Sequence, residues 1–171
     1  LDKNDCLISA RMGTDENDVV LVTRKGQSIR FPVKDIRTSL RASGGVRAIK
    51  LIGEDQVVDM DVVNPEAYLL VVTERGFGKI TPLARYPIQK RAGSGVKTFH
   101  LTSKTGQVAA AAQVTETRQV MLISANGVVT RTPVREEDPR KGITVQGRST
   151  QGVKLMDIKP DDGLVAITVF D

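Results

Sequence analysis

The chain has 171 residues, 40% of them hydrophobic and 26% charged, with a formal net charge of +5 at pH 7. This composition is typical of a globular protein, excludes an intrinsically disordered chain, and includes no apolar run long enough to span a membrane. One cysteine and one histidine exclude an internal disulfide and the usual zinc sites, so we expect a cytoplasmic protein with neither cofactor nor membrane partner.

In chain order, residues 1–17 are interpreted as the end of a preceding structural unit, with a short strand at residues 6–10. The β-branched run at residues 18–23 predicts a second strand. Gly26 predicts a hairpin turn, because glycine readily adopts the positive φ that such turns need, and residues 27–31 return as the partner strand. Pro32 ends that strand, since proline lacks the N–H that a sheet requires.

A loop with basic and small residues follows, and then residues 45–51 alternate apolar and basic side chains, which predicts another strand. Acidic turn residues lead to a last strand at residues 57–63. Only residues 33–40 and 83–88 could form a helical turn. Four short strands in about 50 residues are typical of one propeller blade.

The same pattern occurs three times. The hairpin glycines Gly26, Gly76 and Gly127 are separated by 76 − 26 = 50 and 127 − 76 = 51 residues. A fixed period of about this size indicates a solenoid, propeller or array. We therefore predict an all-β, propeller-like single domain with about three four-stranded blades, the repeats covering roughly residues 18–63, 64–114 and 115–169. Six extra residues in the third repeat, within residues 136–143, are expected in a surface loop.

Each repeat also carries a seven-residue signature. It consists of a basic residue, three small or polar residues, Gly-Val and a second basic residue, so that two cations flank a glycine corner. The copies are residues 41–47, 91–97 and 148–154. Glycine leaves backbone N–H groups accessible, and cations beside them suit a phosphate. The predicted phosphate contacts are Arg41, Arg47, Arg91, Lys97, Arg148 and Lys154, supported by Lys25, Arg30, Lys79, Lys90 and Arg131.

The charge is distributed in phase with the repeats. Residues 24–50 carry eight cations and one acidic residue, a net of 8 − 1 = +7, whereas residues 51–66 carry five acidic residues and no cation. Stacked repeats would therefore present a positive stripe. With no tryptophan and only 4% aromatic residues, base stacking on single strands is disfavoured, and duplex DNA is the expected partner.

No enzyme constellation is visible, so we do not expect an active site. His100 lies beside Phe99 and Leu101 in a predicted strand and is interpreted as structural, and Tyr68 and Tyr86 as packing residues. The glycine strings lack the lysine and the following helix of a nucleotide-binding loop.

Residues 120–134 joined to residues 147–155 closely resemble the closing repeat of the C-terminal domain of DNA gyrase A. Residues 73–87 resemble the preceding repeat of that family, and residues 37–51 the one before. The resemblance implies a β-pinwheel, a disc in which neighbouring blades exchange a strand, with DNA bent around a basic rim. In that family the wrapping assists negative supercoiling by the full enzyme, a bacterial type IIA topoisomerase, so the implied partners are the rest of gyrase A together with gyrase B.

The family's discs usually have six blades, so about half a disc is implied. The hallmark heptad, Gln-Arg-Arg-Gly-Gly-Lys-Gly, is missing; residues 89–95 are its nearest relative and keep Gln89, Arg91, Gly93 and Gly95. We therefore expect DNA binding and bending without supercoiling by this chain alone.

Alternatives remain at this point. The C-terminal domain of topoisomerase IV shares the repeat. A propeller-like platform for protein partners would need an exposed aromatic patch, for which Phe31, Phe77 and Tyr86 are the candidates. The open sheet edges of half a disc also predict either a monomer with capped edges or a homodimer.

Overall fold

The computed structural model describes residues 6–40, 43–136, 138 and 141–171, and its regular elements are strands and two single helical turns. The turns are the 3₁₀ helices η1 (Val33–Asp35) and η2 (Leu83–Arg85), both where helical turns were expected. The strands are β1 (Asp18–Thr23), β2 (Gln27–Pro32), β3 (Val57–Val62), β4 (Tyr68–Thr73), β5 (Phe77–Pro82), β6 (Val96–Lys97), β7 (Val108–Val114), β8 (Gln119–Ser124), β9 (Val129–Pro133), β10 (Val153–Lys154) and β11 (Leu164–Phe170). The all-β prediction is confirmed. Among the described residues, no helix is long and apolar enough to cross a membrane.

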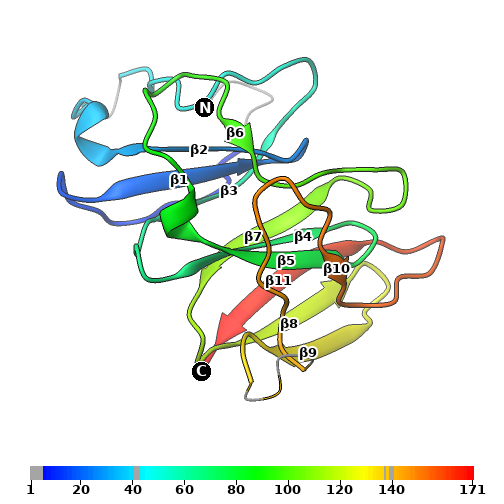
Figure 1. Cartoon of the computed structure of the whole chain (residues 1–171). Coiled ribbons are helices and arrows are strands. Elements are labelled where there is room, and N and C mark those ends of the chain that lie inside the picture. Colours follow the sequence, from blue (N-terminus) through cyan, green and yellow to red (C-terminus); the bar gives the residue numbers. More distant parts are fainter. Residues whose placement is uncertain (1–5, 41–42, 137, 139–140) are drawn as a thin grey trace.

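The strands form three small antiparallel sheets that follow one another along the molecule (Figure 1). The first has the order β3-β1-β2-β6, the second β10-β5-β4-β7 and the third β11-β8-β9. Each sheet is built on a hairpin, β1-β2, β4-β5 or β8-β9, as the repeat predicts. The three sheets confirm the propeller-like blades; the first two have the predicted four strands, and the third has three among the described residues.

Neighbouring blades exchange a strand. β6 lies in the second repeat but pairs with β2 of the first sheet, where Val96 is opposite Ser28. β10 lies in the third repeat and pairs with β5 of the second sheet, where Val153 is opposite Gly78. The outer strand of a blade is thus supplied by the next repeat, the arrangement that the family resemblance implied.

Two predicted strands are wrong, and strand exchange explains one of them, at residues 45–51. Residues 45–51 and residues 6–10 are not assigned to any strand. By analogy with β6 and β10, the pairing partner of residues 45–51 would be a hairpin preceding β1, and none of the described residues forms one. A strand needs a hydrogen-bonded neighbour as well as a favourable sequence. Of residues 6–10, Ser9 donates a hydrogen bond to the carbonyl of Met60 in β3.

Glycine in the signature is required by close packing against the preceding blade. Gly152 has a φ of +70°, and a Cβ there would lie 2.6 Å from the carbonyl oxygen of Gly78 in β5. Gly95 has a φ of +74°, and a Cβ there would collide with the carbonyl of Ser28 in β2. These glycines let the exchanged strands reach their sheets.

The core lies between the blades. Leu69 and Val71 of β4 pack with residues of the first sheet, and the alternate residues Leu70 and Val72 pack with residues of the third. Both faces of the middle sheet are therefore buried, which accounts for the uninterrupted apolar run of β4. β3 and β11 both contact β7, so β3, β7 and β11 form the inner side of the array. β6 and β10 lie at the opposite, outer ends of their sheets.

Candidate nucleic-acid interface

Two exposed lysines occupy equivalent places on the exchanged edge strands. Lys97 of β6 is opposite Gln27, and Lys154 of β10 is opposite Phe77, each one residue after the hairpin glycine of the receiving sheet. Their valine neighbours, Val96 and Val153, are half-buried. Lys154 Nζ lies 2.8 Å from Asp157 Oδ1 in an exposed ion pair, which water screens strongly.

The corner at residues 90–93 is tied to the first repeat by its own arginine. Arg91 Nε donates to the carbonyl oxygen of Asp35 at 3.1 Å, and Arg91 Nη1 donates to that of Arg47. The N–H of Ala92 donates to the carbonyl of Ala48, 2.8 Å away. Part of the donor capacity of Arg91 is thus used inside the protein, whereas Lys90 and the side chain of Arg47 are exposed.

Beside this corner lies a cationic cleft of about 310 Å³. Its cations are Lys25 and Lys50, and the other lining residues are Gln27, Ile52 and Asp55 together with Ser94 and Gly95, which follow the corner. Lys50 was absent from the predicted contacts; its only signal in the sequence is membership of the basic stretch 24–50. Two lysines, a hydroxyl group and a glycine corner form a setting suited to an anion.

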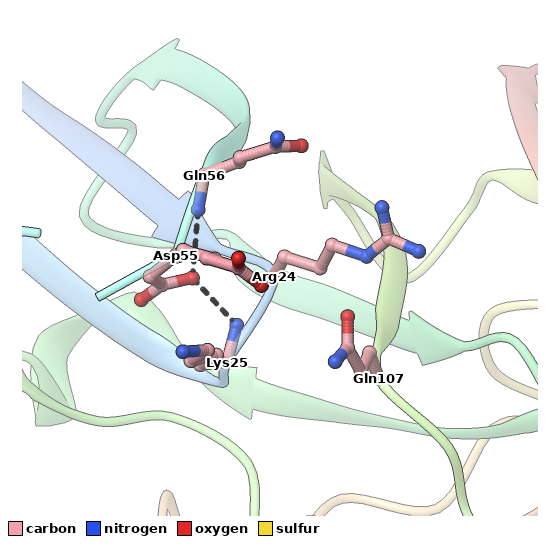
Figure 2. A pocket seen from close by; sticks show the side chains of 6 residues that line it. Arg24, Lys25, Asp55, Gln56 and Gln107 are labelled. Carbon is pink, nitrogen blue, oxygen red and sulfur yellow. Dashed lines mark hydrogen bonds between the residues drawn. The ribbon is translucent and has the colours of Figure 1, made fainter. Parts of the chain in front are cut away.

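A second cleft, of about 530 Å³, is also lined by Lys25 (Figure 2). The carboxylate of Asp55 accepts hydrogen bonds from the backbone N–H groups of Lys25 and Gln56, at 2.8 and 2.9 Å. Arg24 lines the cleft and forms an ion pair with Glu74 across the two repeats, with Nη2 2.7 Å from Oε1. Its mixed charges make this cleft less suited to phosphate than the cleft beside Lys50.

The corner at residues 147–150 is held by a buried lysine of the sheet on which it packs, and not by its own arginine. Lys79 of β5 is fully buried, and its Nζ donates to the carbonyl oxygens of Gly147 and Arg148 and to Thr150 Oγ1, at 2.5, 2.7 and 2.9 Å. The ammonium group also lies 5.1 Å from the ring centroid of Phe99. Burial, followed by repulsion from Arg148, lowers the pKa of Lys79 to about 8.

Arg30 and Arg131 are equivalent in the repeat but differ in environment. Arg30 Nη2 lies 2.7 Å from Asp18 Oδ2 in a largely buried pair, and Nη1 donates to the carbonyl of Leu83. Arg131 is exposed; its Nε donates to Gln119 Oε1 at 2.6 Å, and its guanidinium lies 5.1 Å from the ring centroid of Phe170. Arg41 lies outside the described residues.

Two acidic residues of β3 lie on the inner side of the array. Asp59 and Asp61 belong to β3, and Asp61 Oδ1 is 3.1 Å from Arg11 Nε. Burial is the main cause that raises the pKa of Asp59. Across the part of the chain that the structure describes, no group of three or more histidine, cysteine or acidic residues could hold a metal ion.

Comparison with known proteins gives one consistent family. A family model for the DNA gyrase C-terminal domain, described as a β-propeller, matches residues 17–64, 67–115 and 118–171. DNA gyrase A of Dehalogenimonas lykanthroporepellens is 55% identical over 163 residues, which cover 95% of this chain and 20% of that protein. DNA gyrase A of Thermotoga maritima is 43% identical over 136 residues, or 78% of this chain and 16% of its own length. The chain thus spans about a fifth of the length of these curated relatives.

Solved structures agree on the fold. A DNA gyrase A C-terminal domain superimposes with a TM-score of 0.80 at 28% identity, covering 91% of this chain and 51% of its own. A C-terminal domain of DNA topoisomerase IV gives a TM-score of 0.89 at 18% identity, covering 100% of this chain and 52% of its own.

Proposed function

This chain belongs to the DNA gyrase C-terminal domain family, and on that basis we propose that it binds and bends duplex DNA along its outer basic edge. It would act as a non-catalytic module of DNA gyrase A in the bacterial cytoplasm, with the rest of gyrase A and with gyrase B as partners. Strand passage and ATP use would belong to those other parts.

One observation carries the proposal: strand exchange repeats the signature lysine from blade to blade. Lys97 and Lys154 occupy the same position of successive edge strands, and both side chains are exposed. Cations at a regular interval on one edge suit a duplex, whose phosphates are also regularly spaced. Among the residues that the structure describes, the side chain of Lys97 has no hydrogen-bond or ion-pair partner, and that of Lys154 has only the exposed pair with Asp157.

The structure refines the set of proposed contacts. Arg30 and Lys79 leave it, because one is held in a largely buried ion pair and the other has no exposed surface. Arg91 contributes less than its equivalents, because it ties two repeats together. Arg41 stays a prediction outside the described residues. The proposed contacts are Arg47, Lys97, Arg148 and Lys154, with Lys25, Lys50, Lys90 and Arg131 and a smaller contribution from Arg91.

Binding by such contacts would be electrostatic and tolerant of sequence. Cations that neutralise phosphates release condensed counterions, and this gain offsets the few kcal/mol that bending a short duplex costs. The acidic residues of β3 lie on the inner side, so they would not oppose DNA at the outer edge.

The test is the affinity for a duplex of about 40 base pairs over a range of salt concentrations, with the variant Lys97→Glu/Lys154→Glu. For about six phosphate contacts, log affinity should fall with log salt with a slope near −5. The double variant should lose both affinity and slope, whereas the control Arg11→Glu, on the inner side, should keep them. Equal binding by wild type and double variant at low salt would overturn the proposal.

Two alternatives are weaker. The platform for protein partners needed an aromatic patch, but Phe31, Phe77 and Tyr86 are 1%, 7% and 2% exposed. A topoisomerase IV parent shares the fold at 18% identity, whereas relatives named as DNA gyrase reach 55%.

A further inference from the structure

The two described signature corners hold their arginines in opposite ways. Arg91 and Arg148 are equivalent, each four residues before the signature glycine, since 95 − 91 = 4 and 152 − 148 = 4. Arg91 donates to two backbone carbonyls of the preceding repeat. Within the described ranges, the Arg148 side chain makes no hydrogen bond and no ion pair to another residue. Arg148 therefore keeps its donors for a ligand.

At the 147–150 corner, Lys79 makes the contacts to the backbone that Arg148 does not make. Its three ammonium hydrogens have three acceptors, of which two are the carbonyls of Gly147 and Arg148 and one is the hydroxyl of Thr150. Thr150 Oγ1 in turn donates to the carbonyl of Gly147, and the N–H of His100 donates to the carbonyl of Thr150, both at 2.9 Å. The corner is thus fixed from below and from one side, and its outer face remains open.

The equivalent position in the first sheet shows that this fold does not need the lysine. Ile29 and Lys79 both follow the hairpin glycine by three residues, since 29 − 26 = 3 and 79 − 76 = 3. Ile29 is also fully buried and lies beneath the other corner, its Cδ1 3.8 Å from where a Cβ on Gly93 would be. An apolar residue therefore suffices where the arginine is itself the tie.

A buried cation without a carboxylate partner is costly. The nearby charged group is Arg148 on the corner, which is also positive and therefore further lowers the pKa of Lys79. β4 presents Val71 opposite it, and Lys154 of β10 is exposed. The hydroxyl of Tyr86 is also within electrostatic reach of Arg148, and burial raises the pKa of that hydroxyl. An external anion at the corner would offset both positive charges.

We propose that Lys79 is a positioning residue for DNA binding: it holds the 147–150 corner so that Arg148 is free to contact a phosphate. This inference rests on the proposed DNA binding. Lys79 itself does not touch DNA. A phosphate near Arg148 favours the charged form of Lys79. Above a pH of about 8, where Lys79 of the free protein has lost its proton, DNA binding would therefore be accompanied by uptake of a proton. The affinity for DNA would then fall as the pH rises above about 8.

The test compares wild type with Lys79→Met and Lys79→Ile, using a duplex of about 40 base pairs between pH 7 and 9.5. Wild-type affinity should fall at least about threefold over this range, whereas both variants should be weaker at pH 7 and nearly independent of pH. Arg148→Ala should lower the salt slope by about 1 in the wild type and by less in the Lys79→Met background. Arg91→Ala should leave the pH profile unchanged.

A measurement on the wild type alone avoids reliance on variants. The resonance of the Lys79 side chain, followed by NMR against pH, should titrate at a higher pH when the duplex is bound. If wild type binds DNA with a steep salt slope but its pH profile matches that of Lys79→Met, the role of Lys79 is overturned and the proposed function stands. If wild type does not bind DNA at all, both proposals fail.

Discussion

Arg30 and Asp18 form a cross-strand ion pair between β2 and β1, with Nη2 2.7 Å from Oδ2 and both side chains less than a fifth exposed. The same guanidinium donates to the carbonyl of Leu83 in η2, so it also joins the first repeat to the second.

We therefore expect Arg30→Ala to destabilise the protein by about 2–3 kcal/mol, because Asp18 would keep a largely buried, unpaired charge. Urea denaturation would measure this. The matched control is Arg131→Ala at the equivalent, exposed position of the third repeat, which should cost less than about 1 kcal/mol. Similar losses for the two variants would contradict the structural role of Arg30.

Gly152→Ala should destabilise the protein by about 2 kcal/mol or more, since its φ is positive and a Cβ would lie 2.6 Å from the carbonyl oxygen of Gly78. Gly45 occupies the same place in the first signature, but nothing lies within 4 Å of a Cβ there and its φ is not positive. Gly45→Ala should change stability by less than about 0.5 kcal/mol. Thermal or urea denaturation of both variants checks the contrast.

The buried amine of Lys79 should make stability depend on pH. Its folded-state pKa of about 8 lies below the ordinary value of 10.5, so between these pH values the unfolded chain binds more protons and the free energy of unfolding rises with pH. Wild type should therefore gain stability relative to Lys79→Met between about pH 8 and 10.5. Below pH 8 the difference between the two should be constant. A difference that stays flat throughout would show that Lys79 has an ordinary pKa.

Lys50→Glu should weaken duplex binding and make the salt slope shallower by about 1, since Lys50 lines the cationic cleft beside Gly95. Arg11→Glu, which makes the same change of charge on the inner side, serves as its control. Binding curves for the two variants that superimpose on each other would place DNA away from this cleft.

The repeat could be predicted from the sequence because each hairpin carries its own information: an apolar run, a glycine turn and a proline that ends the second strand. Strand exchange was suggested by the family resemblance alone. The alternation at residues 45–51 indicated a strand, but pairing depends on a neighbouring hairpin that lies elsewhere in sequence, and no local pattern contains it.

The burial of individual basic residues could not be predicted from the sequence either. Lys79 and Arg131 both lie in the second strand of a hairpin, and their sequence surroundings give no reason to expect that one is enclosed and the other exposed. The acceptors that satisfy Lys79 come from residues 147–150, about 70 positions later in the chain. Long-range contacts of this kind decide which cations remain at the surface.

The exchange of β6 and β10 also determines how the molecule carries a mechanical load. A pull on Lys97 acts on a two-residue strand that is hydrogen-bonded to β2, while its chain continues into the second repeat. Lys154 is placed in the same way between the second and third repeats. Tension applied along this edge would be shared by two adjacent blades, and the exchanged strands would resist the separation of one blade from the next.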